Sequence, residues 1–210
     1  MKNKITIILF LTFIMCKALF AEEYKFEVKE IELTDNANII KAYDGKIYSK
    51  DKDLEIVAEK FNYNKKLDLL EAYNGSALIN SNNLNIKFNK LNIDNNKSIL
   101  KAIGGVKIID YKNSLDIETK TLIFDKINNF LTATDGVEIN DTRNTLNILT
   151  KSILFDRENQ ILKSNTNSVL QDKYNNIFKT KNFEHNLSNN VLKITDAILE
   201  QADKNIFKIK

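Results

Sequence analysis

The chain holds few residues of the types that do chemistry, and those few are repeated rather than clustered. His185 is the only histidine and Cys16 the only cysteine. A catalytic histidine needs a partner that gives or takes its proton, and no such pattern accompanies His185. We therefore expect His185 to be a half-buried ring in a strand. Because a metal site cannot be built from so few imidazoles and thiols, we predict no catalytic residue, metal ligand or cofactor.

Three aspartates stand out because they recur at a constant spacing. Asp94, Asp125 and Asp156 follow one another at a spacing of 31 residues. A paired-carboxylate active site needs two acids in unlike environments, whereas these three have like surroundings. We expect them to accept hydrogen bonds in turns at strand ends. The Asp-Gly and Asn-Gly pairs are too sparse for calcium-binding repeats, which are far richer in both residues. The chain is thus predicted not to be an enzyme.

The elements that carry these residues recur with a period of about 30 residues. All five glycines lie on this period, and each glycine follows an alanine by two or three residues. The segments are Ala42 to Gly45, Ala72 to Gly75, Ala102 to Gly105 and Ala133 to Gly136, with weaker copies at 167–168 and 196–197. One such unit cannot bury its apolar face alone. The sequence therefore predicts a stack of repeats.

Between the glycines, apolar and polar residues alternate with a period of two, which is typical of strands with one face in water. The parity changes inside each copy: Leu84, Ile86 and Phe88 share one parity, and Leu91 and Ile93 share the other. A slip at one place in every copy indicates a bulge or corner, and stacked corners would fold a sheet into a V or a sandwich edge. Long strands are expected at 26–33, 54–64, 84–94, 115–125, 146–156 and 178–186, with shorter strands on either side of each glycine kink.

Apolar residues recur at matching positions of these strands, and two interpretations are open. They form either a packed core between two sheet faces or the lining of an open apolar groove. A groove of like pockets along a stack suits a long-chain lipid, because an acyl tail needs only burial, worth about 0.8 kcal/mol per methylene. The groove candidates are Ile56, Phe61, Tyr63, Ile86, Phe88, Leu91, Ile93, Ile117, Leu122, Phe124, Ile148, Ile153, Phe155 and Phe183.

The first 21 residues are predicted to be a secretory signal peptide. Two lysines precede the apolar run Ile5–Met15, which is too short to span a bilayer of about 30 Å as a helix. Cleavage is expected after Ala18 or Ala21. Lipidation of Cys16 and an uncleaved anchor are the alternatives.

Removal of this segment changes the charge of the chain. It contains three lysines and no acid, out of 31 basic and 28 acidic residues in all. The remainder therefore has no net formal charge, and its lysines are not clustered. A nucleic-acid binder should show a basic face, so nucleic acid is not an expected partner.

Two phrases of the repeat resemble the OstA-like (LptA-like) family of lipopolysaccharide transport. They are residues 100–106 (Leu-Lys-Ala-Ile-Gly-Gly-Val) and 120–125 (Lys-Thr-Leu-Ile-Phe-Asp), and their recurrence at one period is the specific part of the likeness. The family's usual Gly-Asn-Val phrase is altered here, and the last two copies lack it. The family includes a free periplasmic bridge protein and the N-terminal domain of the outer-membrane assembly protein LptD, and both assignments stay open.

The resemblance implies an all-β fold over residues 22–210, a twisted V-shaped β-jellyroll of two facing antiparallel sheets. It implies a periplasmic module that cradles the lipid A acyl chains of lipopolysaccharide and passes them toward the outer membrane. The implied protein partners are other Lpt jellyrolls, joined by edge-strand pairing, and further copies of the chain, joined head to tail. The opening of another strand at 205–210 would offer such an edge.

Two competing functions come from other classes. An exported structural or adhesive repeat protein would have the same strands, a filled core and no lipid. A polysaccharide-processing enzyme would need paired acids out of step with the repeat, and the sequence contains no such pair.

Overall fold

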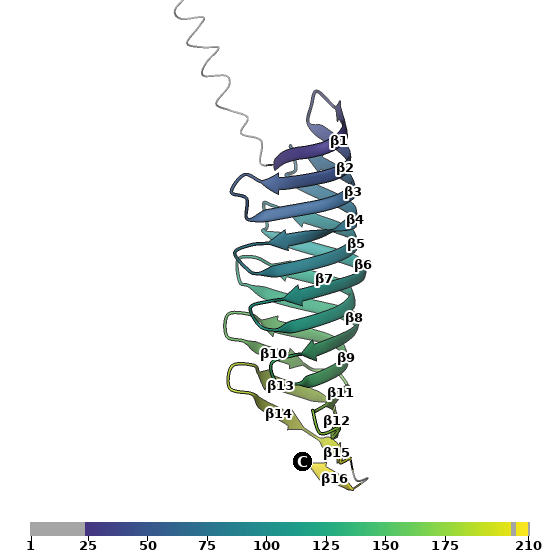
Figure 1. Ribbon diagram of the computed structural model, residues 1–210, viewed down its shortest axis with the longest axis vertical. Helices are drawn as coiled ribbons and strands as arrows, with labels where there is room; N and C mark the ends of the chain where they lie inside the picture. The colour runs from purple at the N-terminus through teal and green to yellow at the C-terminus, as the bar shows by residue number, and fades with distance from the viewer. Residues whose placement is uncertain (1–23, 203–204, 210) are drawn as a thin grey trace, which may run out of the picture.

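The structure is an elongated stack of antiparallel strands (Figure 1). It is a computed structural model that describes residues 24–202 and 205–209. The predicted signal peptide lies outside these residues. Among the described residues, no helix is long and apolar enough to cross a membrane.

Nine long strands make up most of the stack, and seven shorter ones complete it. The long strands are β1 (Tyr24–Thr34), β2 (Ile39–Ser49), β3 (Leu54–Asn64), β4 (Leu69–Ile79), β5 (Leu84–Asp94), β6 (Ile99–Asp110), β7 (Leu115–Asp125), β8 (Phe130–Asp141) and β9 (Leu146–Asp156). The short strands are β10 (Ile161–Ser164), β11 (Ser168–Gln171), β12 (Ile177–Thr180), β13 (Asn182–Asn186), β14 (Val191–Thr195), β15 (Ala197–Glu200) and β16 (Ile206–Ile209).

The all-β fold is confirmed, with one correction: the described strands form one 16-stranded sheet, not two facing sheets. From β1 to β9 each strand pairs with its sequence neighbours along its whole length. The glycine segments do not divide these strands, so β2, β4, β6 and β8 run through their glycines. Beyond β9 the sheet branches, because the first half of β9 pairs with β11 and its second half with β10.

A crease in the middle of every long strand turns this one sheet into two facing walls. In β5, Leu84, Ile86 and Phe88 are buried before the crease, and Leu91 and Ile93 after it. The first wall consists of the half-strands that carry Ile56, Ile86, Ile117 and Ile148, and the second wall of those that carry Phe61, Leu91, Leu122 and Ile153. The predicted parity slip is therefore confirmed as a fold line.

The glycines stand on the fold line for two different reasons. A Cβ on Gly75 would lie 2.1 Å from the carbonyl oxygen of Val57, so the neighbouring strand leaves no room for a side chain. Gly105 and Gly136 have φ angles of +61° and +93° and open space around them. They form bulges where β6 and β8 hold one residue more than the 11-residue strands, and the register shifts there.

Four-residue turns join the strands from β1 to β10 and form two rows along the outer edges of the walls. One row, at the edge of the second wall, includes 65–68, 95–98, 126–129 and 157–160, and the other, at the edge of the first wall, includes 50–53, 80–83, 111–114 and 142–145. The repeated aspartates act in the first row, as predicted. Asp125, for example, accepts hydrogen bonds from the backbone N–H groups of Ile127 and Asn128, both at 3.0 Å. These bonds, with that of Asn128 the largest contribution, lower the pKa of the Asp125 carboxyl.

Candidate functional site

The candidate site is the apolar space between the two walls, called here the trough. All fourteen residues predicted to line a groove face this space and belong to one core cluster. Their exposed fractions lie between 0 and 4%. The trough is therefore filled by its own side chains, and the packed-core and groove interpretations name the same residues. Binding of lipid by these residues stays a prediction.

The composition of the trough changes along the stack. Between β2 and β5 its buried positions are Ile, Leu, Ala, Phe and Tyr. From β6 onward, buried polar groups join the apolar ones: Asp110 and Asp141 at the rim of the first wall, and Thr119 and Thr150 beside the crease. The C-terminal part of the trough thus has a polar rim and a polar floor that the N-terminal part lacks.

The two rows of turns face each other across the mouth of the trough, and a buried arginine joins them. Arg157, in the turn after β9, donates from Nε to Asp110 Oδ2 at 2.7 Å, from Nη1 to Asn129 Oδ1 at 2.9 Å and from Nη2 to the carbonyl oxygen of Asn82 at 2.7 Å. Its guanidinium carbon lies 5.7 Å from the centre of the Phe124 ring. Arg157 and Asp110 are 1% and 0% exposed. We call these four polar residues, Asn82, Asp110, Asn129 and Arg157, the clasp.

Further hydrogen bonds, from within the clasp and from a neighbouring residue, hold the clasp together. Asn82 Nδ2 donates to Asn129 Oδ1 at 3.3 Å, which links one row of turns directly to the other. Asn113, itself fully buried, holds the Asp110 carboxylate through its backbone N–H at 3.1 Å and its side-chain amide at 2.9 Å. Asp110 is thus held by the turn that follows it, while it accepts a hydrogen bond from Arg157 on the opposite side of the mouth.

A second polar link crosses the mouth one repeat later. His185 Nδ1 lies 3.9 Å from Asp141 Oδ2, and Asn144 Nδ2 donates to the carbonyl oxygen of Leu187 at 3.3 Å. His185 occupies the strand position held by Phe124 and Phe155 in earlier repeats, as predicted, but it is fully buried rather than half-buried. The added depth comes from β10 and β14, which flank β13 on both sides.

The mouth is hollow toward the N-terminal end of the stack. A cavity of about 580 Å³ lies between the rows of turns there, lined by the buried Tyr24 and Leu54 and by Asp51, Asn95 and Lys126. The hydroxyl of Tyr24 donates to Asn95 Oδ1 at 2.9 Å across this hollow. The mouth is therefore tied at intervals and does not close along its whole length.

Within residues 24–202 and 205–209, neither end of the trough is capped. On β1, Ile31 pairs with Ala42 and Leu33 with Ile40, so all four share the interior face. The β2 residues are buried, whereas Ile31 and Leu33 are 52% and 58% exposed. At the other end Phe207 continues the interior row of Leu170, Phe178 and Leu199 and is 50% exposed. The apolar interior thus continues into solvent-exposed apolar side chains at both ends.

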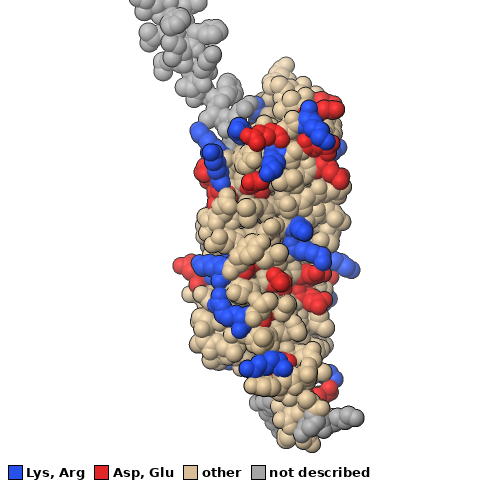
Figure 2. Space-filling view, viewed as in Figure 1, with Lys and Arg blue, Asp and Glu red and all other residues tan. Residues whose placement is uncertain are grey.

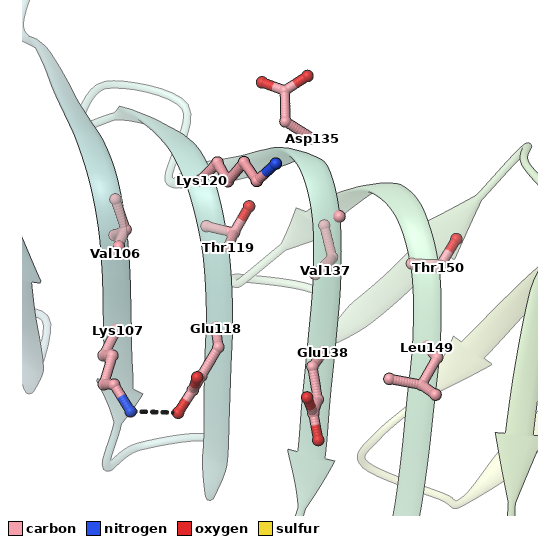
Figure 3. Close-up of a pocket in the computed structure, with 12 residues that line it drawn as sticks. Val106, Lys107, Glu118, Thr119, Lys120, Asp135, Val137, Glu138, Leu149 and Thr150 are labelled. Carbon is pink, nitrogen blue, oxygen red and sulfur yellow. Dashed lines mark hydrogen bonds and ion pairs between the residues drawn. The ribbon is translucent and has the colours of Figure 1, made fainter.

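The crease has a hollow of its own on the outer side of the sheet (Figure 3). Its volume is about 430 Å³, and the Lys107–Glu118 ion pair, at 2.6 Å, crosses one side of it. The two threonine hydroxyls at this level are used inside the fold: Thr119 donates to the carbonyl oxygen of Thr134 at 2.7 Å, and Thr150 contacts the Ser164 hydroxyl at 2.9 Å. This hollow therefore presents no free reactive group from these two residues.

Among the described residues, no group of three or more His, Cys, Asp or Glu side chains is placed to hold a metal ion. Figure 2 shows positive and negative side chains interspersed over one face, with broad uncharged areas between them.

The sequence interpretation missed the clasp. Two signals pointed to it: Asp110 and Asp141 interrupt the inward apolar alternation of β6 and β8, and Arg157 is one of only two arginines in a lysine-rich chain.

Comparison with known proteins identifies no family for this chain. No protein-family model and no curated protein matches this sequence. Among solved structures, the chain is similar to LptH, described as the LptA-homologous periplasmic component of the conserved lipopolysaccharide transport device from Pseudomonas aeruginosa. The TM-score is 0.49 and the sequence identity 9%, over 60% of this chain and 94% of that one. A likeness at this level assigns neither a ligand nor a partner.

Proposed function

We propose that this chain is a periplasmic lipopolysaccharide-binding module, which shields lipid A acyl chains and passes the lipid toward the outer membrane within a transenvelope bridge. The repeated sequence phrases support this assignment through their family resemblance. The observation that carries it is the uncapped trough, whose interior face continues at Ile31 and Leu33 as exposed apolar surface. A repeat protein with a purely structural role would gain solubility from a polar cap at this place.

The chemistry of the trough fits acyl chains better than any polar ligand. Its N-terminal half offers buried aliphatic and aromatic side chains, with which a tail makes only apolar contacts. Each methylene taken out of water contributes about 0.8 kcal/mol, so a few tails bound between the walls supply affinity without specific hydrogen bonds. The fourteen residues predicted from the sequence are the proposed tail contacts, once the walls part.

The ends of the sheet supply the proposed partners. Within the described part of the chain, β1 pairs only with β2, and β16 only with β15, so each leaves one strand edge for another chain. Pairing of such edges would align the uncapped trough of one module with that of the next. The partners proposed on this ground are other Lpt jellyrolls and further copies of this chain.

Photocrosslinking from neighbouring positions of β1 tests the function. A photoreactive amino acid at Leu33 faces the interior side, and one at Glu32 faces the opposite side of the same strand. We expect lipopolysaccharide to be captured in cells from Leu33, and from interior positions such as Phe124, but not from Glu32. Equal capture from Leu33 and Glu32, or capture from Glu32 alone, would reject the lipid trough.

The exported structural or adhesive repeat protein is the second candidate, and the filled interior is the observation in its favour. Native mass spectrometry of gently purified protein separates the two functions. A mass increment that matches lipopolysaccharide supports transport, whereas a bare chain isolated from a lipopolysaccharide-containing periplasm supports the structural role.

A further inference from the structure

Within the clasp, Arg157 and Asp110 form a buried ion pair that joins the two walls. Arg157 and Asp110 are 47 residues apart and lie on opposite sides of the mouth, Arg157 in the turn after β9 and Asp110 at the end of β6. Between them, the three nitrogen positions of the guanidinium bind one side chain of each wall and a backbone carbonyl of the first wall. The other buried pair across the mouth, His185 and Asp141, is 3.9 Å apart and makes no hydrogen bond at this distance.

A buried ion pair is a poor choice if stability alone were needed. Taking both charges out of water costs about as much as their attraction returns, and apolar residues of similar size would hold the walls at least as well. The position of Arg157 in the repeat is occupied elsewhere by Lys65, Asn95, Lys126 and Leu187, so the other repeats do without an arginine there. The ion pair adds a contact of fixed geometry, and its hydrogen bonds all break together when the walls separate.

The burial of the trough side chains gives such a contact a role. The fourteen proposed tail contacts are at most 4% exposed, so an acyl chain can enter from the mouth only if the walls move apart. The N-terminal hollow beside Leu54 already opens part of the mouth, and the clasp closes it farther along.

We propose that the Arg157–Asp110 clasp is a latch that keeps the trough shut in its middle, and that its release admits acyl chains from the mouth. The latch rests on the proposed lipid-binding function, since it regulates access to that same site. The walls hinge at the crease, and the clasp sits at the opposite edge, where a small change of angle gives the largest separation.

Thiol labelling measures the opening without any lipid. With Cys16 replaced by serine, Ala102→Cys places the only thiol in the trough on β6, the strand that ends at Asp110. Ala42→Cys places it at the same position two repeats earlier, and both alanines are 0% exposed. We expect Arg157→Met to raise the rate at which a water-soluble disulfide reagent labels Cys at position 102 by about tenfold or more, with little change at position 42. Equal increases at both positions, or none, would overturn the latch.

A covalent tether provides the second arm, and it does not depend on the stability of Arg157→Met. In the Cys16→Ser variant, Asn82→Cys and Asn129→Cys replace two clasp residues whose side chains touch across the mouth. A short bis-methanethiosulfonate joins these thiols, and dithiothreitol removes it. Uptake of the fluorescent fatty acid cis-parinaric acid is expected to be at least about tenfold slower in the tethered protein and to recover on reduction.

The two arms separate failure of the latch from failure of the proposed function. Fatty-acid uptake that is equally fast in the tethered and reduced proteins overturns the latch and leaves lipid binding intact. If neither form takes up fatty acid or lipopolysaccharide, while Arg157→Met still exposes position 102 selectively, lipid binding is overturned and the clasp remains the contact that holds the walls together.

Discussion

Ala58 and Gly75 lie opposite each other on β3 and β4 at the fold line, in contact so close that Gly75 cannot carry a side chain. A Cβ built on Gly75 would lie 2.7 Å from the Cβ of Ala58 and 2.1 Å from the carbonyl oxygen of Val57. The crease therefore depends on backbone packed directly against backbone at this level of the stack.

We expect Gly75→Ala to destabilise the fold by about 1–3 kcal/mol or more, because the added methyl group meets main-chain atoms that cannot move aside. Gly105→Asn is the matched control. Its site has a φ of +61° and open space, and asparagine tolerates this backbone conformation, so the cost should stay below about 1 kcal/mol. Urea unfolding followed by circular dichroism gives both values. A larger loss for Gly105→Asn than for Gly75→Ala would contradict this account of the crease.

Removing one partner of the clasp should be costly, and removing both should not. Arg157→Met leaves the Asp110 carboxylate buried without its cation, which predicts a loss of about 3–5 kcal/mol in the free energy of unfolding. The double variant Asp110→Leu/Arg157→Met should recover most of this loss, because no uncompensated charge remains. Equilibrium unfolding in urea measures both. If the double variant were as unstable as the single one, the ion pair would not be the group that matters at the mouth.

Charge at the uncapped N-terminal end should impair lipid binding without impairing the fold. Leu33→Lys places a cation on the interior face at an exposed position, so the free energy of unfolding should change by no more than about 0.5 kcal/mol. Capture of lipopolysaccharide from an interior photoreactive position should fall severalfold. Glu32→Lys, on the opposite face of the same strand, is the control and should leave capture unchanged. Equal effects of the two substitutions would indicate a general charge effect in place of a specific end of the trough.

The ion pair between Glu71 and Lys90 makes stability depend on pH. The hydrogen bond from Lys90, 2.7 Å long, lowers the pKa of the Glu71 carboxyl below its ordinary value. A lowered folded-state pKa gives a stabilisation that is fully present above the unfolded pKa, about 4.3, and is lost as the pH falls through the folded pKa.

Glu71→Gln should therefore be less stable than the parent at pH 7, with a difference that shrinks as the pH falls below the unfolded pKa of about 4.3. Thermal unfolding across this range checks it, with Glu30→Gln, an exposed carboxylate on β1, as the control. A difference that stayed constant with pH would show that Glu71 acts through packing and not through its charge.

Much of the architecture was predictable because it follows from local periodicity. The strands β3, β5, β7 and β9 have the bounds expected from their alternation, and the slip between Phe88 and Leu91 placed the crease. The prediction of one further strand at 178–186 was wrong, because β12 and β13 are separate. The repeat there has lost its glycine phrase, and the chain bends at Lys181 between the two walls.

The contacts across the mouth were not predictable in the same way. Arg157 and Asp110 meet only because the fold line brings two rows of turns together, and no local pattern encodes the distance between the walls. The same limit explains His185. Its place on the strand followed from the repeat, but its full burial depends on two flanking strands, β14, which follows β13 directly, and β10, which lies three strands earlier in the chain.

The branching of the sheet after β9 affects how stiff the molecule is along its length. Up to β9, every strand crosses the crease as part of a hydrogen-bonded ladder, so bending there strains several backbone bonds at once. Farther on, the chain crosses the crease outside any strand, at residues 165–167, at Lys181 and at Asp196, and β12 and β13 belong to different branches. The last repeats therefore resist hinge motion less than the first ones, and the C-terminal end of the molecule is where thermal motion should change the interwall angle most.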